Sequence, residues 1–229
     1  MLDLLMITHN RLEYLQKSLP TVLANDFDKL TIWDNASNLE VINYLYSIKN
    51  LRIDIVLGDK NESLAKITSE VFLKSKAEFV GKVDSDMLIP SDWSKRLLEA
   101  HGKYHFGFIG GLHFRPQDLE NLNPNIEDFN GIKLWRKHHI GGQFIIRRED
   151  FKAYGGQGVM GLSEYQAEMG LINGYLWPPL WVEHMEDARS EHYISTMEYE
   201  NYKLQTRGVT LAQYQDSIIN PSYMKENTL

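Results

Sequence analysis

The chain has 229 residues, of which 43% are hydrophobic and 24% charged, a balance typical of globular domains and unlike disordered, collagenous or coiled-coil chains. Its formal net charge of −7 argues against a nucleic-acid binder that neutralises phosphates with a domain-wide basic excess. Because Cys is absent, a disulfide framework, a thiolate nucleophile and a Cys-based zinc site are excluded, which suits a reducing compartment.

The sequence shows no segment typical of export or of a membrane span. Its apolar start, Met1 to Ile7, carries Asp3, lacks a cationic lead and runs at once into polar residues, so it is too short for a signal peptide. No stretch approaches the roughly 20 apolar residues that a transmembrane helix needs. We therefore expect a cytoplasmic location and leave peripheral membrane contact open.

The first hundred residues alternate short apolar runs with longer amphipathic stretches, a pattern typical of βα units around a mostly parallel sheet. The expected strands are Leu2–Ile7, Leu30–Trp33, Ile53–Leu57 and Phe79–Val83. The expected helix faces are Leu12, Leu15, Leu19, Val22 and Leu23, then Leu64, Ile67, Val71 and Phe72. The fold class is thus α/β, a mostly parallel central sheet flanked by helices.

Farther along the chain the pattern changes. Ser91 is a plausible N-cap for a helix over 92–100, strands are expected over 106–110 and 143–146, and a helix over 163–172. The stretch 115–131 is rich in Pro, Asn, Asp and Gly and is predicted to be a long loop that contacts the second substrate. We divide the chain into a domain over 1–185, with halves 1–100 and 101–185, and a helical C-terminal extension over 186–229.

Polar residues gather where the first four strands should end. These clusters are Thr8-His9-Asn10-Arg11, Asp34-Asn35-Ala36-Ser37, Asp59 to Ser63 and Asp84-Ser85-Asp86. In open parallel sheets, ligands bind outside the carboxyl ends of the strands, so the clusters should converge on one crevice. Asp84-Ser85-Asp86 on its own also fits a solvated turn. In this context, its paired carboxylates are suited to a hard cation and a phosphorylated ligand.

The order of these elements resembles family 2 glycosyltransferases of the GT-A fold over about residues 1–185. The matching motifs are Thr8-His9-Asn10-Arg11, Asp34-Asn35-Ala36-Ser37, Asn61-Glu62-Ser63, Asp84-Ser85-Asp86 with Trp93 beyond it, and Gly141-Gly142 with Arg147-Arg148 and Phe151. One departure is Ser63, which stands where the family usually has Gly.

The resemblance implies roles for most of these residues. Asp34 would hydrogen-bond the nucleotide base, and Thr8, Asn10 and Arg11 would line the nucleotide pocket. Asn61 opens the third helix, and Lys66, one turn on, could face the diphosphate. Asp84 would hold the ribose or a metal-bound water, and Asp86 would ligate the metal directly.

Two further roles come from the second half of the domain. Glu164 stands where the family places a catalytic carboxylate, and as a base it would take the proton from the acceptor hydroxyl. His184 resembles the late His that can complete the metal shell, with Glu183, Glu186 and Asp187 as nearby rivals.

The resemblance therefore implies an inverting, metal-dependent enzyme that moves a sugar from a UDP-, GDP- or dTDP-sugar to a hydroxyl of a glycan, lipid-linked or protein acceptor, with Mn²⁺ or Mg²⁺ as cofactor. One alternative is a nucleotidyltransferase on a similar fold, although the first strand end lacks the Gly-rich loop typical of that class. The other is a non-catalytic sugar-binding module.

Overall fold

A computed structural model describes the chain except for residues 120–123, 156–158, 195–200, 202–203, 205–207 and 220–229. In the first half the elements are β1 (Leu2–Thr8), α1 (Leu12–Leu23), β2 (Lys29–Asp34), α2 (Leu39–Ser47), β3 (Ile53–Leu57), α3 (Leu64–Lys74), β4 (Phe79–Val83), β5 (Met87–Leu88) and α4 (Trp93–Lys103). In the second half they are β6 (Ile109–Gly110), α5 (Pro116–Leu119), β7 (Ile126–Phe129), β8 (Ile132–Arg136), β9 (Gln143–Arg147), α6 (Arg148–Tyr154), α7 (Val159–Glu168), β10 (Gly174–Trp177), β11 (Glu183–His184) and α9 (Leu211–Ile219).

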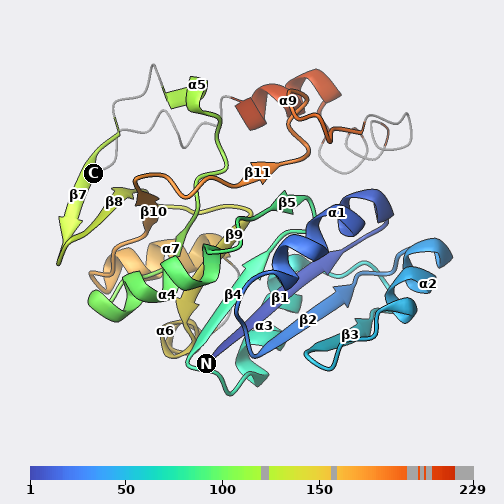
Figure 1. Cartoon of the computed structure of the whole chain (residues 1–229), viewed down its shortest axis with the longest axis horizontal. Coiled ribbons are helices and arrows are strands. Elements are labelled where there is room, and N and C mark those ends of the chain that lie inside the picture. The colour runs from blue at the N-terminus through green and yellow to red at the C-terminus, as the bar shows by residue number, and fades with distance from the viewer. Residues whose placement is uncertain (120–123, 156–158, 195–200, 202–203, 205–207, 220–229) are drawn as a thin grey trace.

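One large sheet organises the fold, with the strand order β3-β2-β1-β4-β9-β6-β10-β8-β7 (Figure 1). Its first four strands are parallel, as the alternating sequence pattern predicted. From β9 onward the sheet is mixed, because β9 pairs antiparallel with both β4 and β6, and β10 pairs parallel with β6 but antiparallel with β8. The predicted α/β class with a mostly parallel central region is confirmed.

Helices cover both faces of this sheet, each over its own apolar cluster. On one face, α1, α2 and α4 contribute buried side chains such as Leu15, Leu45 and Trp93. On the other face, α3, α6 and α7 contribute Phe72, Phe151 and Leu162. No helix in the described ranges combines the length and apolar character that crossing a bilayer requires.

The four predicted strands of the first half are confirmed to within one residue, whereas the helix expected over 92–100 runs three residues farther, to Lys103, and its predicted cap is wrong. The helix begins at Trp93 with Asp92 at the N-cap position, and no side chain caps it. The amide of Trp93 bonds instead to the carbonyl of Pro90 at 3.1 Å. A backbone turn therefore satisfies the helix start, so Ser91 is not needed as a cap.

The predicted loop over 115–131 is wrong in part, because α5 lies near its start and β7 near its end. Residues Asn130 and Gly131 both have positive φ, 55° and 81°, and join β7 to β8 as an antiparallel hairpin. An Asn-Gly pair is the sequence signal of this two-residue turn. The turn signal is in the sequence, but β7 itself has only a weak alternating pattern that does not predict a strand.

Three further boundaries move. The strand expected over 106–110 contains only β6, and the strand over 143–146 extends by one residue to Arg147. The helix expected over 163–172 runs earlier, from Val159 to Glu168. It ends there because Gly170 adopts a positive φ of 75° and Leu171 donates back to the carbonyl of Gln166 at 2.8 Å, a typical glycine stop.

Candidate functional site

Two sharp turns follow β1 and β2, and they lie side by side because Thr8 pairs with Asp34 in the sheet register. Asn10 and Arg11 have positive φ of 55° and 62°, and Ala36 has φ of 63°. A non-glycine residue in this left-handed region costs of order 1 kcal/mol, and such strain concentrates at functional sites. The strand ends are therefore a region where backbone strain is tolerated.

Hydrogen bonds hold the two turns together. The amide of Asn10 donates to Ser37 Oγ at 2.8 Å, and the amide of Asn38 donates to Asn10 Oδ1 at 2.9 Å. The carboxylate of Asp34 is buried, and its Oδ2 accepts from the amide of Ser37 at 3.1 Å. Its Oδ1 is buried with no hydrogen-bond partner among the described residues. One buried acceptor at the end of β2 thus remains available.

The third strand end joins this network through Asn35. Its Nδ2 donates to Asn61 Oδ1 at 2.8 Å, and its Oδ1 accepts from the amide of Glu62 at 2.8 Å. Beyond them, Ser63 caps α3 by accepting from the amide of Lys66 at 3.2 Å. The Lys66 ammonium is exposed and pairs with Glu62 at 2.9 Å. The cap explains why Ser fits where the family usually has Gly.

After β4 the two carboxylates of Asp84-Ser85-Asp86 take different places. The amide of Asp84 bonds to the carbonyl of Gly142 at 2.8 Å, and its half-buried carboxylate pairs with the ammonium of Lys82. Asp86 is buried and leads into β5. The two carboxylates therefore have separate partners.

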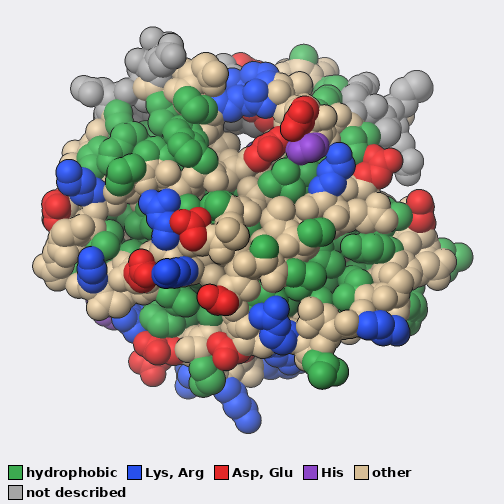
Figure 2. All heavy atoms as spheres, viewed as in Figure 1, with side chains coloured by type: hydrophobic (Ala, Val, Ile, Leu, Met, Phe, Trp, Pro, Cys, Tyr) green, Lys and Arg blue, Asp and Glu red, His purple; other side chains and the backbone are tan. Residues whose placement is uncertain are grey.

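The short strand β11 brings distant residues to Asp86. It pairs antiparallel with β5, with His184 opposite Met87, and the amide of Met185 donates to the carbonyl of Asp86 at 2.9 Å. As a result, one ligand atom each from Asp86, His184 and Glu186 lies within 4.8 Å of the others. We call Asp86, His184 and Glu186 the acidic triad. Figure 2 shows acidic side chains and a histidine gathered on the surface near β11.

A cation of the protein itself lies against this triad. The Arg11 guanidinium pairs with Asp86 Oδ2 at 3.1 Å and also forms an ion pair with the Glu186 carboxylate. Burial acts to raise the pKa of Asp86, but the hydrogen bond and charge of His184, with the charges of Arg11 and Lys82, hold that pKa well below its usual value. Asp86 is thus an anion across the physiological range.

A second histidine packs behind the first. The rings of His113 and His184 lie 6.2 Å apart, edge to face, and His113 also packs against Phe114 and Tyr175. Burial, with the charge of His184, lowers the pKa of His113 to about 3. His113 is therefore neutral near pH 7 and packs against the His184 ring without adding positive charge to the triad.

The donor set fits a divalent cation. Two carboxylates and one imidazole are ligands that Mn²⁺ accepts readily, whereas Mg²⁺ favours oxygen alone. Asp86 Oδ1 is buried with no hydrogen-bond partner among the described residues, so this carboxylate oxygen can bind a cation without breaking a hydrogen bond. The residues at this end of the sheet can therefore hold a metal next to the strand-end turns.

Comparison with known proteins places the chain in a family. The model of glycosyl transferase family 2 matches residues 3–160, more than half of the chain. The chain belongs to glycosyl transferase family 2. A search of curated protein sequences gave no match.

Solved structures share the fold at low sequence identity. A mannosyltransferase, PcManGT from Pyrobaculum calidifontis in complex with GDP-Man and Mn²⁺, superposes with a TM-score of 0.64 at 15% identity, over 96% of this chain and 64% of that one. GalNAc-T7 with UDP, GalNAc and Mn²⁺ gives 0.62 at 15% identity, over 94% and 50%. S. aureus TarS 1-349 in complex with UDP-GlcNAc gives 0.60 at 14%, over 95% and 70%. This chain thus spans half of the GalNAc-T7 chain, and the likeness confirms the predicted GT-A fold.

In this family 2 domain, most of the predicted site residues lie in one region. Thr8, Asn10, Arg11, Asp34 and Asn61 belong to the connected strand-end turns, and Asp86 and His184 belong to the acidic triad. Arg11 joins the two groups through its ion pairs.

Three predicted residues belong to neither of these two groups. Asp84 pairs with Lys82, and Lys66 pairs with Glu62 on the first turn of α3. Glu164 is exposed in the middle of α7, with no hydrogen bond or ion pair to the triad among the described residues. The helix begins before Glu164, so this residue is not at the helix start that the resemblance implied.

Sequence reasoning named Glu186 only as a rival of His184, yet it completes the triad. It is almost fully buried, with 2% of its surface exposed. Its proximity in sequence to His184 is the available signal, although Glu186 lies in the turn that follows β11 and not in the strand itself. Its burial depends on the C-terminal helix, which no motif in the sequence connects to the site.

Proposed function

We propose that this domain transfers a sugar from a nucleoside diphosphate donor to a hydroxyl acceptor, with inversion at the anomeric carbon and with a divalent metal, Mn²⁺ in preference to Mg²⁺. The observation that carries the proposal is the acidic triad at the carboxyl end of the sheet, in a chain that belongs to glycosyl transferase family 2. The inversion rests on the family resemblance.

Asp86, His184 and Glu186 would hold the metal. A bound cation would offset the negative charge that develops on the departing diphosphate. The triad supports this assignment because its ligand atoms lie within 4.8 Å of one another and Asp86 Oδ1 has no hydrogen-bond partner among the described residues. Asp84 already pairs with Lys82. It would act next to the metal, on the ribose or on a metal-bound water.

The strand-end turns would bind the nucleoside. The buried Oδ1 of Asp34 can accept an N–H of the base, and the turns of Thr8 and Asn10 supply the wall beside it. The Arg11 guanidinium pairs with two carboxylates of the triad. If a metal bound those carboxylates, the guanidinium would be released and could pair with the diphosphate instead. Asn61, which accepts a hydrogen bond from Asn35, would form another part of the wall of the nucleoside pocket. The exposed Lys66 would reach a phosphate only if its ion pair with Glu62 opened.

Glu164 would be the catalytic base. Its exposed carboxylate on α7 is accessible to an acceptor hydroxyl, whose proton it would take as the oxygen attacks the anomeric carbon. In such a single displacement the sugar passes through an oxocarbenium-like state and the diphosphate leaves from the opposite face.

The test is a thermal-shift screen of UDP-, GDP- and dTDP-sugars with and without Mn²⁺, followed by donor-hydrolysis and transfer assays with the donor that stabilises the protein most. A ligand that binds only the native state raises the melting temperature. We expect at least one donor to do so in a Mn²⁺-dependent way, and Asp86→Asn to remove that dependence.

Asp92→Asn is the matched control, since Asp92 makes no side-chain cap hydrogen bond at the start of α4. A screen in which no donor stabilises the protein would contradict the proposed donor class. An Asp86→Asn variant that responds to Mn²⁺ as the wild type does would contradict the metal site.

A further inference from the structure

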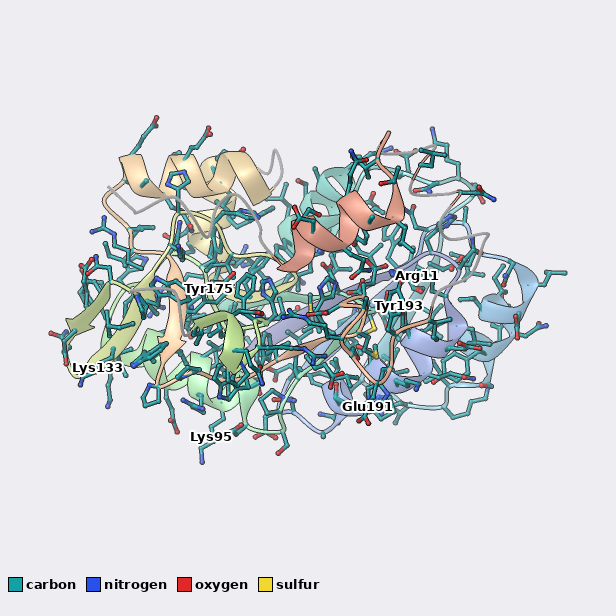
Figure 3. All side chains as sticks on the ribbon, turned by 90° about the horizontal axis from the view of Figure 1, so that it is seen from above. Arg11, Lys95, Lys133, Tyr175, Glu191 and Tyr193 are labelled. Atoms are coloured by element: carbon teal, nitrogen blue, oxygen red, sulfur yellow. The ribbon has the colours of Figure 1, made fainter. Side chains whose placement is uncertain are left out.

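The C-terminal helix α9 packs directly on the acidic triad. Tyr214 is buried, with 7% of its surface exposed, and its hydroxyl donates a hydrogen bond to Glu186 Oε2. Figure 1 shows α9 above β11 on the side of α1, and in Figure 3 the labelled Arg11 and Tyr193 lie in the same region as this helix. A helix about 25 residues farther along the chain thus reaches a proposed metal ligand.

The same helix also holds the backbone around Glu186. Gln215 Nε2 donates to the carbonyl of Glu186 at 2.8 Å, and Gln215 Oε1 accepts from the amide of Ala188 at 2.8 Å. Both ends of one side-chain amide therefore bond to the turn that carries Glu186. Such a paired contact fixes the turn in position and orientation, beyond what apolar packing alone provides.

Glu186 is held from two sides by different groups. One carboxylate oxygen, Oε1, faces the Arg11 guanidinium, and the other, Oε2, accepts from Tyr214. The next residue, Asp187, has its own restraint, a paired contact with Arg189 that includes a 2.9 Å bond from Nε to Oδ1. Arg11 and Tyr214 thus each restrain one oxygen of the Glu186 carboxylate. Of these two groups, Arg11 bears a charge that a metal could replace.

We propose that Tyr214 is a positioning residue for the metal site and that α9 completes this site by orienting Glu186. The inference rests on the proposed metal role of the acidic triad. Hydrogen bonds from outside the ligand set orient metal-binding carboxylates, and their loss typically weakens metal affinity about 10- to 100-fold. The C-terminal extension is then part of the active site of the domain.

The test measures Mn²⁺ binding by the full chain, by isothermal titration calorimetry and by the electron paramagnetic resonance signal of free Mn²⁺. Tyr214→Phe removes only the hydroxyl and should weaken Mn²⁺ binding about 10- to 100-fold. Tyr46→Phe, which removes the same group from an exposed position on α2, should bind as the wild type does. Gln215→Ala, which frees the turn without touching the carboxylate, should also weaken binding.

A double variant separates positioning from general damage. In a Glu186→Ala background, Tyr214→Phe should cause no further loss of Mn²⁺ affinity, because its partner is absent. Equal losses in both backgrounds, or an unchanged affinity of Tyr214→Phe, would overturn the inference. If Tyr214→Phe does not fold by circular dichroism, Gln215→Ala decides, and wild-type affinity in that variant would overturn it too.

The outcomes also separate this inference from the proposed function. If the wild type binds no Mn²⁺, or if Asp86→Asn binds it as tightly as the wild type, the metal site itself is wrong. If the wild type binds Mn²⁺, Asp86→Asn loses it, and Tyr214→Phe behaves as the wild type does, the metal site stands and only the role of α9 is wrong.

Discussion

Arg11 is the residue whose side chain joins the strand-end turns to the acidic triad. Its guanidinium pairs with Asp86 and Glu186, and its side chain is only 25% exposed. Arg11→Ala would leave two buried carboxylates facing each other, and loss of one partner of such a network costs up to about 3 kcal/mol. We expect a lower melting temperature without metal and a larger stabilisation by Mn²⁺ than in the wild type, measured by differential scanning fluorimetry.

The control for this variant is Lys74→Ala, which removes an exposed ion pair with Glu70 on α3. Exposed pairs contribute about 0–1 kcal/mol, so its melting temperature and its response to Mn²⁺ should be close to those of the wild type. A Mn²⁺ response of Arg11→Ala no larger than that of Lys74→Ala would show that Arg11 and the metal do not share the same carboxylates.

Glu164 is the residue proposed as the catalytic base. Glu164→Gln keeps the shape of the side chain but cannot take a proton, so turnover should fall by about 10²- to 10⁴-fold with donor binding retained. Glu168→Gln is the matched control, because it is exposed on the same helix one turn later. Initial rates and the donor-induced thermal shift are the two measurements, and an unchanged rate in Glu164→Gln would rule out its role as the base.

The family resemblance assigns Asp86 and His184 to one metal site, and the structure brings their side chains together. Residue patterns could not place Tyr214 or give Glu186 a definite role. A hydrogen bond between residues 28 positions apart leaves no periodic trace in the sequence. Long-range pairing of polar side chains is set by the packing of whole elements, and a single sequence does not contain that information directly.

The helix α4 is attached to β9 through a buried histidine. His101 is 1% exposed, and its Nε2 lies 3.1 Å from the carbonyl of Ile145. Burial lowers the pKa of His101 to about 4 from an ordinary value of 6.5. Between these values the unfolded chain binds a proton that the folded chain does not. Folding stability should therefore be lost as pH falls below about 6.5.

His101→Gln tests this connection, since an amide can still donate to Ile145 but does not titrate. In urea unfolding, the wild type should lose about 2 kcal/mol more than His101→Gln between pH 7 and pH 5. His138→Gln, which removes an exposed histidine, should lose as much stability as the wild type over the same range. If His101→Gln shows the same pH dependence as the wild type, His101 does not remain neutral in the folded protein.

Elements with strong local patterns could be predicted, and elements defined by their partners could not. The strands β1 to β4 are apolar runs bounded by polar turns, so their bounds follow from the sequence to within a residue. The strand β11 has only Glu183 and His184, both half-buried, and exists because β5 pairs with it. Tertiary contact outweighs local propensity in such short strands.

The family match ends at residue 160, but the sheet continues beyond it. The strand β10 (Gly174–Trp177) lies between β6 and β8 in the sheet and pairs with both. Its Tyr175 is fully buried. A chain that ends at residue 160 would leave the hairpin of β7 and β8 without its neighbour, and an isolated hairpin is at best marginally stable in water.

We therefore expect a chain of residues 1–160 to lack a cooperative urea transition by circular dichroism and tryptophan fluorescence. A chain of residues 1–194 keeps β10 and β11 and loses α9. It should unfold cooperatively, at a lower urea concentration than the full chain, and bind Mn²⁺ more weakly because nothing then orients Glu186 from the side of Tyr214. If residues 1–160 unfold as cooperatively as the full chain, β10 is not integral to the folding unit. If residues 1–194 bind Mn²⁺ as tightly as the full chain, the sheet and its turns form the metal site without the C-terminal helix.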